Sequence, residues 1–600
     1  MTKRKKTLRA LAVLCLALSF PFLLLALAPV RAVIIRCAED FLRRDLADEV
    51  WHGRLFARGV VWFLSGAACA AGFFLLSEIR LSDESGATRL RFLAPTRSVL
   101  AGGGQAFVCA LAATFALISA VRLHWLGEKT GWHEDELYTI GITNVNDIGF
   151  WHTSDDFEKG VPYSGKEIKD AVFFDDGSLG DTLHDVARLW VNTGDNPNTD
   201  FYYILHRLAF FRTRTHDFGT IRLRLGILHY LIFAVSFHFM LLLLSELSES
   251  RASVILLLLA SFLNPATVGL GVFFRAYIVE EMMLIVFTYV FVVFYKAVRN
   301  GETVDTRANL VKGAAATALT LNSSYFSALY VALLGLFLLA LCLRRKRRRE
   351  AFFFVTMLFS ALIATRFLYL DFGMGFVSER YPSSFADSMR RGLLLVVTSV
   401  SEQYANFFAL LAVFVLNVAS GAACAAIARK KGGREEFFAP PAVIFLCALL
   451  WLVLTGYFCP IKSLRYCAPA FALLCSAAVP TLRGGTAASR ALAAAIHAML
   501  ALSALSRSFP SQRNRANIEH LDDSNPAYSK AEYAARPEET VFIQLGSSYE
   551  KILPYLNDSQ TYYFVDDESE IGALPKSGPY WYISEFPGSG IPDFRRIGGK

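Results

Sequence analysis

Long apolar runs alternate with short polar segments along most of the chain. The run from Val99 to Val121, "VLAGGGQAFVCALAATFALISAV", is typical of them. Runs of roughly 18 or more apolar residues indicate helices that cross a membrane. The pattern predicts about thirteen spans, with ends placed to within roughly two to four residues. They are Leu8–Val30, Gly59–Ile79, Val99–Val121, Leu223–Leu247, Ser253–Phe274, Tyr277–Val298, Leu310–Leu321, Tyr325–Leu343, Ala351–Phe372, Val400–Ala428, Pro440–Phe458, Tyr466–Leu482 and Ser489–Ser506.

Composition supports this fold class, an all-α polytopic membrane protein. The chain is 54% hydrophobic and only 19% charged, whereas soluble proteins of this size carry about 25% charged residues. A membrane β-barrel would show short segments of alternating polarity instead of long apolar runs.

Basic clusters give the expected orientation. "KRKK", "RRKRRR" (344–349) and "RKKGGR" (429–434) each adjoin an apolar run, and such clusters mark cytoplasmic helix ends. Because they lie at helix ends rather than within a soluble domain, binding to nucleic acid is disfavoured. The basic cluster at the N-terminus places that end of the chain in the cytoplasm. Because the number of predicted spans is odd, the C-terminal segment is then expected to lie outside. The loop Arg31–Arg58, rich in both charges, is expected to lie outside as an interfacial helix.

Two parts outside the membrane are large, and they set the expected domain organisation. One is the loop Arg122–Asp200, and the other is the tail from Arg507 to Lys600. The tail contains strand-like segments at 540–545, 560–566 and 580–586, which predict a small α/β unit. We therefore expect a two-helix extension (1–98), a transmembrane domain (99–506) that includes the loop 122–200, and a C-terminal domain (507–600).

Three consecutive carboxylates follow the third span, in "GWHEDELY" (131–138). A carboxylate at the boundary between water and membrane loses part of its hydration, which raises its pKa and suits it to general base catalysis. Asp135 and Glu136 are the candidates for this role. A solvated acidic loop is the alternative.

Cationic residues also fall on the predicted outer side. Arg275 lies near the apolar region between two spans, and Lys462 and Arg465 lie in a short outer loop. Arginine and lysine side chains carry several N–H donors, which suit a lipid phosphate or diphosphate. The alternatives are a structural Arg–Glu pair for Arg275, and side chains that extend to the membrane interface for the other two. The predicted site is an outward-facing cavity, with polar and aromatic walls expected from Asp195, Tyr202, Tyr277, Asn322, Tyr325 and Tyr466.

The order of these motifs resembles the GT-C superfamily of polyprenyl-phosphate-sugar glycosyltransferases, in particular the branch with protein O-mannosyltransferases and lipid A aminoarabinose transferases. The resemblance covers roughly 99–506 and rests on Asp135-Glu136 in "HEDELYTIGIT", on "DNPNTDFYYILHRL" (195–208), on Arg275-Ala-Tyr277 and on Arg465-Tyr466. The chain departs from the family pattern in having Asp200 where an apolar residue is usual, and Ser324-Tyr325-Phe326 where the family has a histidine.

The resemblance implies a membrane glycosyltransferase that moves a sugar from a polyprenyl-phosphate donor to a hydroxyl of a glycan, lipid or protein on the outer face of the membrane. Asp135 is then the expected base, Glu136 positions it or the acceptor, and single displacement inverts the anomeric carbon. The scheme requires no cofactor. A divalent metal stays open as an alternative, with His152, Asp155 and Asp156 as its candidate ligands.

The expected location is a bacterial cytoplasmic membrane. The main alternative is a transporter or flippase for a lipid-linked or anionic substrate. Transporters usually place ionisable residues on broken helices near the bilayer midplane. A membrane scaffold whose tail binds a partner is another. The sequence names neither the sugar nor the acceptor.

Overall fold

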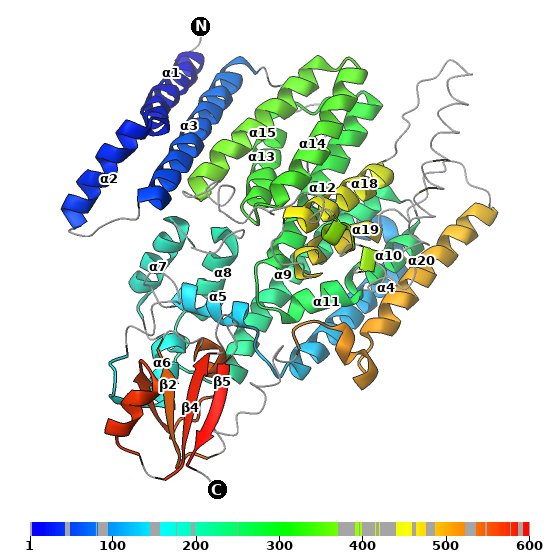
Figure 1. The fold of residues 1–600 in the computed structure, drawn as a ribbon. Helices are drawn as coiled ribbons and strands as arrows, with labels where there is room; N and C mark the ends of the chain where they lie inside the picture. Colours follow the sequence, from blue (N-terminus) through cyan, green and yellow to red (C-terminus); the bar gives the residue numbers. More distant parts are fainter. Residues whose placement is uncertain are drawn as a thin grey trace.

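The protein, seen here in a computed structural model, is a bundle of helices with one small sheet at its side (Figure 1). The sheet lies near the C-terminus, and helices of the first large loop lie between it and the bundle. The structure describes residues 3–42, 48–79, 81, 90, 94–144, 157–175, 177–191, 193, 199–248, 250–369, 390–394, 397–398, 415, 419, 440–458, 464–475, 487–521, 536–545, 549–576, 578–585 and 592–598.

Within these residues, seven helices are long and apolar enough to cross a membrane, or up to eight if one bent pair counts as a span. The chain is therefore a multi-pass membrane protein, but the thirteen predicted spans are not confirmed. Most of the predicted span Val400–Ala428 lies outside the described residues. The seven fall in α1 with η1 (Lys3–Ser19, Phe20–Ala26), α4 (Ala94–Glu128), α9 (Phe218–Leu247), α12 (Tyr277–Asn300), α14 (Ser327–Arg344), α15 (Arg348–Leu368) and α18 (Pro440–Phe458).

Four further predicted spans coincide with helices or helical turns that are shorter or less apolar. Three of them are α3 (Asp48–Glu78), which begins well before the predicted Gly59, α13 (Arg307–Leu321) and α20 (Ala487–Ser508). The predicted span Tyr466–Leu482 begins instead as η4 (Leu464–Tyr466), η5 (Ala468–Ala470) and the single turn α19 (Phe471–Leu474). The loop Arg31–Arg58 is helical on both sides of residues 43–47, in α2 (Ala28–Leu42) and the start of α3.

The predicted span Ser253–Phe274 contains a bend that the hydropathy pattern does not show. The chain instead forms α10 (Arg251–Phe262) and α11 (Pro265–Val272), which meet at 57°. The side chain of Asn264 accepts the N–H of Thr267, and Pro265 occupies the first turn of α11. An N-cap followed by proline begins a new helix rather than continuing the old one. The bend returns the chain towards the acidic loop.

α12 follows this bend and forms the centre of the bundle. Every residue of its apolar window is buried, and it packs against α9, α13 and α14. The buried helix therefore fixes the position of its first residue, Tyr277. It also fixes the short segment 273–276, which joins α11 to α12.

The sheet unites the first large loop with the C-terminal tail. Its order is β1-β3-β2-β4-β5, with parallel pairs β2/β3 and β2/β4 and antiparallel pairs β1/β3 and β4/β5. The three strand-like segments of the tail are present as β2, β3 and β4. The loop contributes β1, and residues of both parts share one hydrophobic core. The strands are β1 (Pro162–Ser164), β2 (Thr540–Gln544), β3 (Thr561–Val565), β4 (Tyr580–Glu585) and β5 (Pro592–Ile597).

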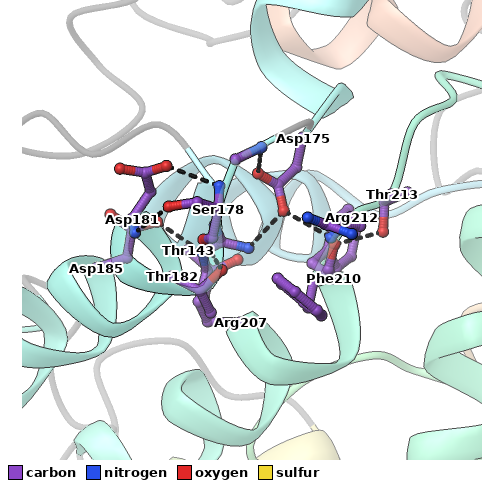
Figure 2. A network of polar contacts seen from close by, with 12 residues as sticks. Thr143, Asp175, Ser178, Asp181, Thr182, Asp185, Arg207, Phe210, Arg212 and Thr213 are labelled. Carbon is purple, nitrogen blue, oxygen red and sulfur yellow. Dashed lines mark hydrogen bonds and ion pairs between the residues drawn. The ribbon is translucent and has the colours of Figure 1, made fainter.

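Charged residues fasten the remaining helices of the loop to one another (Figure 2). Arg207, which is 2% exposed, donates from Nε to Asp185 at 2.8 Å and from Nη1 to Asp175 at 3.0 Å. The backbone N–H of Arg212 also donates to Asp175. These buried ion pairs join α8 to α7 and to the segment after α6, and so give the loop a defined shape next to the bundle. The helices are α5 (Glu134–Asn144), α6 (Gly165–Phe173), α7 (Leu179–Val191) and α8 (Asp200–Phe210).

Candidate active site

The acidic motif forms the first turn of a helix. Glu134, Asp135 and Glu136 open α5, where negative charge interacts favourably with the unpaired N–H groups and the helix dipole. This local reason accounts for three adjacent carboxylates without any catalytic role. Their surroundings then differ sharply, because neighbouring helical residues point in different directions.

Glu136 is fully buried and anchors α5 to the bundle. Its Oε2 accepts from Lys129 Nζ at 3.0 Å and from the N–H of His133 at 2.8 Å, and its Oε1 accepts from the N–H of Phe274 at 2.8 Å. Burial raises the pKa of Glu136, and the charge of Lys129 and the two N–H groups oppose that rise. Both oxygens are thus committed to holding α5 against the segment between α11 and α12.

Asp135 faces the opposite way and is partly exposed, at 18% of its side chain. Its Oδ2 lies 2.6 Å from Nη1 of Arg465, which is itself 8% exposed. Nδ1 of His133 accepts the N–H of Asp135 at 3.1 Å. The candidate base and one candidate phosphate ligand, 330 residues apart by their numbers, are therefore in direct contact.

Arg275 lies next to Asp135 but contacts its backbone. Nη1 donates to the carbonyl of Asp135 at 3.0 Å and to Oγ1 of Thr139 at 2.6 Å, and it lies 3.4 Å from the hydroxyl of Tyr203. The neighbouring Glu280 accepts a hydrogen bond from Ser327 at 2.9 Å. Arg275 therefore positions α5 and brings a positive charge close to the candidate base.

Aromatic residues border the Asp135–Arg465 pair. Tyr277 packs edge-on against Tyr466 at 5.5 Å between ring centroids, and the guanidinium of Arg465 lies over the ring of Tyr466 at 5.2 Å. The turn that holds Asn322 and Tyr325 adjoins them, because the ring of Phe326 lies 6.4 Å from that of Tyr466. Both Asn322 and Tyr325 are buried.

The structure brings together six of the predicted site residues and leaves others apart. Asp135, Glu136, Arg275, Arg465 and Tyr466 form one group with Tyr277. Tyr202 faces the bundle, where its hydroxyl lies 2.9 Å from Nε2 of His229. Lys462 and Asp195 lie outside the described residues.

Sequence reasoning missed three contributors to this site. Lys129 lies in a loop and did not stand out in the sequence. Its position seven residues before Glu136 is only a weak signal that the two side chains form an ion pair. Phe273 and His520 carried no signal, because only the packing of the α11–α12 junction against the C-terminal segment places their rings 3.8 Å apart at the site.

The buried carboxyl group of Asp200, at the start of α8, makes the stability of the protein depend on pH. It is 2% exposed, and burial raises its pKa to about 8 against the opposing effect of two backbone N–H groups. The unfolded chain loses this proton at about pH 3.9, so the native state keeps a proton that the unfolded state has released. Stability is therefore lost as pH rises from about 4 through 8.

Asp200→Asn is expected to stabilise the protein at pH 7 by on the order of 1–3 kcal/mol and to flatten this pH dependence. The measurement is thermal unfolding of the detergent-solubilised chain between pH 5 and pH 8. Glu538→Gln, at an exposed carboxylate, is the control and should change neither quantity. Equal slopes for wild type and Asp200→Asn would show that Asp200 is ionised in the native state.

The residues that the structure describes contain no group of three or more His, Cys, Asp or Glu side chains that could hold a metal ion. His152, Asp155 and Asp156, which the sequence left open as ligands, lie outside them.

Comparisons with known proteins add little to this geometry. No protein-family model and no curated protein matches the chain. A solved structure to which it is similar is the arabinosyltransferase EmbB from Mycobacterium smegmatis, with 13% sequence identity and a TM-score of 0.32. The match covers 80% of this chain and 43% of that chain, so this chain spans less than half the length of EmbB. A likeness at this TM-score does not establish a shared fold or function.

Proposed function

We propose that the chain is a membrane glycosyltransferase that transfers a sugar from a polyprenyl phosphate to an acceptor hydroxyl on the outer face of the membrane. The single observation that carries the proposal is the contact between Asp135 and Arg465 at 2.6 Å. It joins a partly exposed carboxylate to a buried guanidinium beside the bent pair α10–α11, with Arg275 next to them.

This pair has the two charges that the reaction needs. An acceptor hydroxyl is a poor nucleophile until a base removes its proton. The leaving lipid phosphate is a stable anion, which requires charge stabilisation more than protonation. The two charges neutralise each other where they are in contact, so a donor phosphate that takes Arg465 would release Asp135 to act on the acceptor.

The transfer then proceeds as a single displacement. The carboxylate of Asp135 takes the hydroxyl proton, and the hydroxyl oxygen forms a bond to the anomeric carbon. The bond between that carbon and the phosphate oxygen breaks, and the polyprenyl phosphate leaves with the electron pair. The anomeric configuration is inverted. Glu136 and Arg275 position α5 during this step, and Lys462 is proposed as a further phosphate ligand.

The experiment is a comparison of cells that carry either the wild-type chain or a folded Asp135→Asn variant. Mass spectrometry of envelope glycans and lipid-linked sugars should show that the variant loses one glycan substituent and accumulates its polyprenyl-phosphate precursor. NMR of the wild-type product should show the anomeric configuration opposite to that of the donor. Unchanged glycans and precursors in the variant would contradict the proposal.

One observation favours the second candidate, a transporter of an anionic or lipid-linked substrate. Arg122 on α4 and Glu281 on α12 are buried near the bent pair α10–α11, and among the described residues neither the guanidinium nor the carboxylate has a hydrogen-bond partner. Buried ionisable residues beside a broken helix are typical of transport sites. This candidate requires movement of the substrate across sealed vesicles without any new glycosidic bond.

A further inference from the structure

The imidazole of His133 lies beside the guanidinium of Arg465. Burial lowers the pKa of His133 to about 4, so the ring is neutral at pH 7. Its Nδ1 accepts the N–H of Asp135, and a neutral imidazole with an accepting Nδ1 carries its proton on Nε2. That Nε2 lies 3.4 Å from Nη1 of Arg465, which is also a donor. Two N–H groups therefore meet here, and Nη1 of Arg465 also pairs with Asp135 Oδ2 at 2.6 Å.

His520 brings a second imidazole to the same place from the far end of the chain. Its ring stacks on Phe273 at 3.8 Å and lies 5.0 Å from the ring of His133. Its Nε2 is buried and has no hydrogen-bond partner among the described residues, and the carboxylate of Glu519 is 3.6 Å away. Burial lowers the pKa of His520 well below its usual value, so this ring too is neutral.

The backbone at His520 is strained, with φ of 65°. For a residue other than glycine this conformation is uncommon and persists only where the surrounding structure enforces it. Strain of this kind is concentrated at binding and catalytic sites.

Hydrogen bonds of the segment 509–521, which we call the C-terminal strap, hold the backbone of His520 in this conformation. Lys129 Nζ donates to the carbonyl of His520 at 2.7 Å, and the N–H groups of Thr130 and Gly131 donate to the carbonyl of Leu521 at 2.9 and 3.1 Å. Arg515 Nη1 bonds to Glu128 at 3.0 Å. The strap is thus fastened to the residues that lead into α5, and His520 is held in place relative to Asp135.

A cavity lies between the strap and α11. Its polar side is formed by Arg465, Asn517, Glu519 and His520, and its apolar side includes Leu270 and Phe273. Nε of Arg465 is buried and has no hydrogen-bond partner among the residues described. The cavity, about 10 Å³ in volume, therefore combines two buried nitrogens that have no hydrogen-bond partner among the described residues with an apolar wall, and the carboxylate of Glu519 also borders it.

We propose that His520 is a ligand-binding residue, delivered by the C-terminal strap, that donates together with Arg465 and His133 to the phosphate of an isoprenyl phosphate. This inference rests on the proposed function for the identity of the ligand and deepens it by assigning to the strap a part of the donor site. A phosphate monoester offers three oxygens as acceptors for these nitrogens, and the first isoprene unit would contact the apolar wall. The C-terminal domain is thereby coupled to donor binding.

The test uses the full chain in detergent with geranyl phosphate as the probe. Inorganic phosphate and geraniol, each at the same concentration, separate the contributions of the anion and the hydrocarbon. Kd is measured by calorimetry for wild type and three variants. His520→Phe keeps the stack on Phe273 but removes the nitrogens, His520→Asn tolerates the positive φ but does not reach as far, and His520→Gln places an amide near the position of Nε2. His184→Phe, at an exposed histidine of α7, is the control.

Geranyl phosphate is expected to bind wild type and the His184→Phe control equally. His520→Phe and His520→Asn are each expected to weaken binding roughly tenfold to a hundredfold, as for the loss of a hydrogen bond to a charged group, and His520→Gln should recover most of it. Unchanged binding in a folded His520→Phe or His520→Asn variant would overturn the inference. Equal binding of inorganic phosphate would overturn the assignment to a lipid phosphate.

This experiment separates the inference from the proposed function. If transfer depends on Asp135 while the His520 variants keep a wild-type KM for the donor, the inference fails and the function stands. If geranyl phosphate binds through His520 but no glycosidic bond forms with any envelope acceptor, the function fails and the binding site stands.

Discussion

Asp135→Asn is expected to lower the rate of glycosyl transfer by about 10²–10⁴-fold, the contribution of a positioned general base. Asparagine has nearly the same shape as aspartate and keeps a carbonyl oxygen for Arg465, and the backbone contacts of residue 135 with His133 and Arg275 do not depend on the side chain. The fold should therefore survive. Initial rates at saturating donor measure the loss, and the unfolding temperature in detergent confirms that the variant is folded.

The matched control is Glu134→Gln, one residue earlier in the first turn of the same helix. It removes one negative charge from the same helix end and so reproduces the general electrostatic effect of the substitution. It should leave transfer within a few-fold of wild type. If Asp135→Asn and Glu134→Gln reduce transfer equally, the effect comes from the net charge of the helix terminus and Asp135 is not the base.

Glu136→Gln is expected to have the opposite profile, with a loss of stability of about 3–5 kcal/mol, because it removes one partner of a buried ion pair. Lys129 is 1% exposed and would keep its charge without a counter-ion. The amide nitrogen of glutamine would also replace one of two oxygens that both accept hydrogen bonds. Chemical or thermal unfolding of the solubilised chain measures the change.

A double-mutant cycle with Lys129→Met tests the assignment of Glu136. Removing the charge of Lys129 relieves the unpaired cation, so the double variant should be more stable than the sum of the two single effects predicts. Additive effects would indicate that the pair contributes nothing beyond each residue alone. Loss of transfer by Glu136→Gln without any loss of stability would instead give Glu136 a direct role in the chemistry.

The sequence by itself determined the fold class and the residues worth testing. Spans such as Tyr277–Val298 were predictable because twenty or more apolar residues are compatible with few environments other than lipid or a helical core. The strands of the tail were predictable from their alternating and β-branched residues. Asp135, Arg275 and Arg465 stood out because charged groups at the edge of apolar segments require a partner or a function.

Local patterns failed where packing or chain reversal intervened. Hydropathy predicted the span Ser253–Phe274 without its bend, because the apolar residues on both sides of Asn264 outweigh the N-cap and proline that bend the chain there. The separate domains expected for the loop and the tail share one sheet, since the pairing of β1 with β3 joins strands about 400 residues apart, a relation that no local pattern contains.

Only the tertiary structure decided how the adjacent carboxylates differ. Asp135 and Glu136 are equivalent in the sequence, but successive positions on a helix face different surroundings. One carboxylate is fully buried against Lys129 and the N–H of Phe274, and the other faces Arg465 and His133 with part of its surface exposed. His520 reaches the same site through a strap that the sequence shows only as a polar tail. Burial and electrostatic partners depend on residues distant in the chain, and these set the chemistry of each side chain.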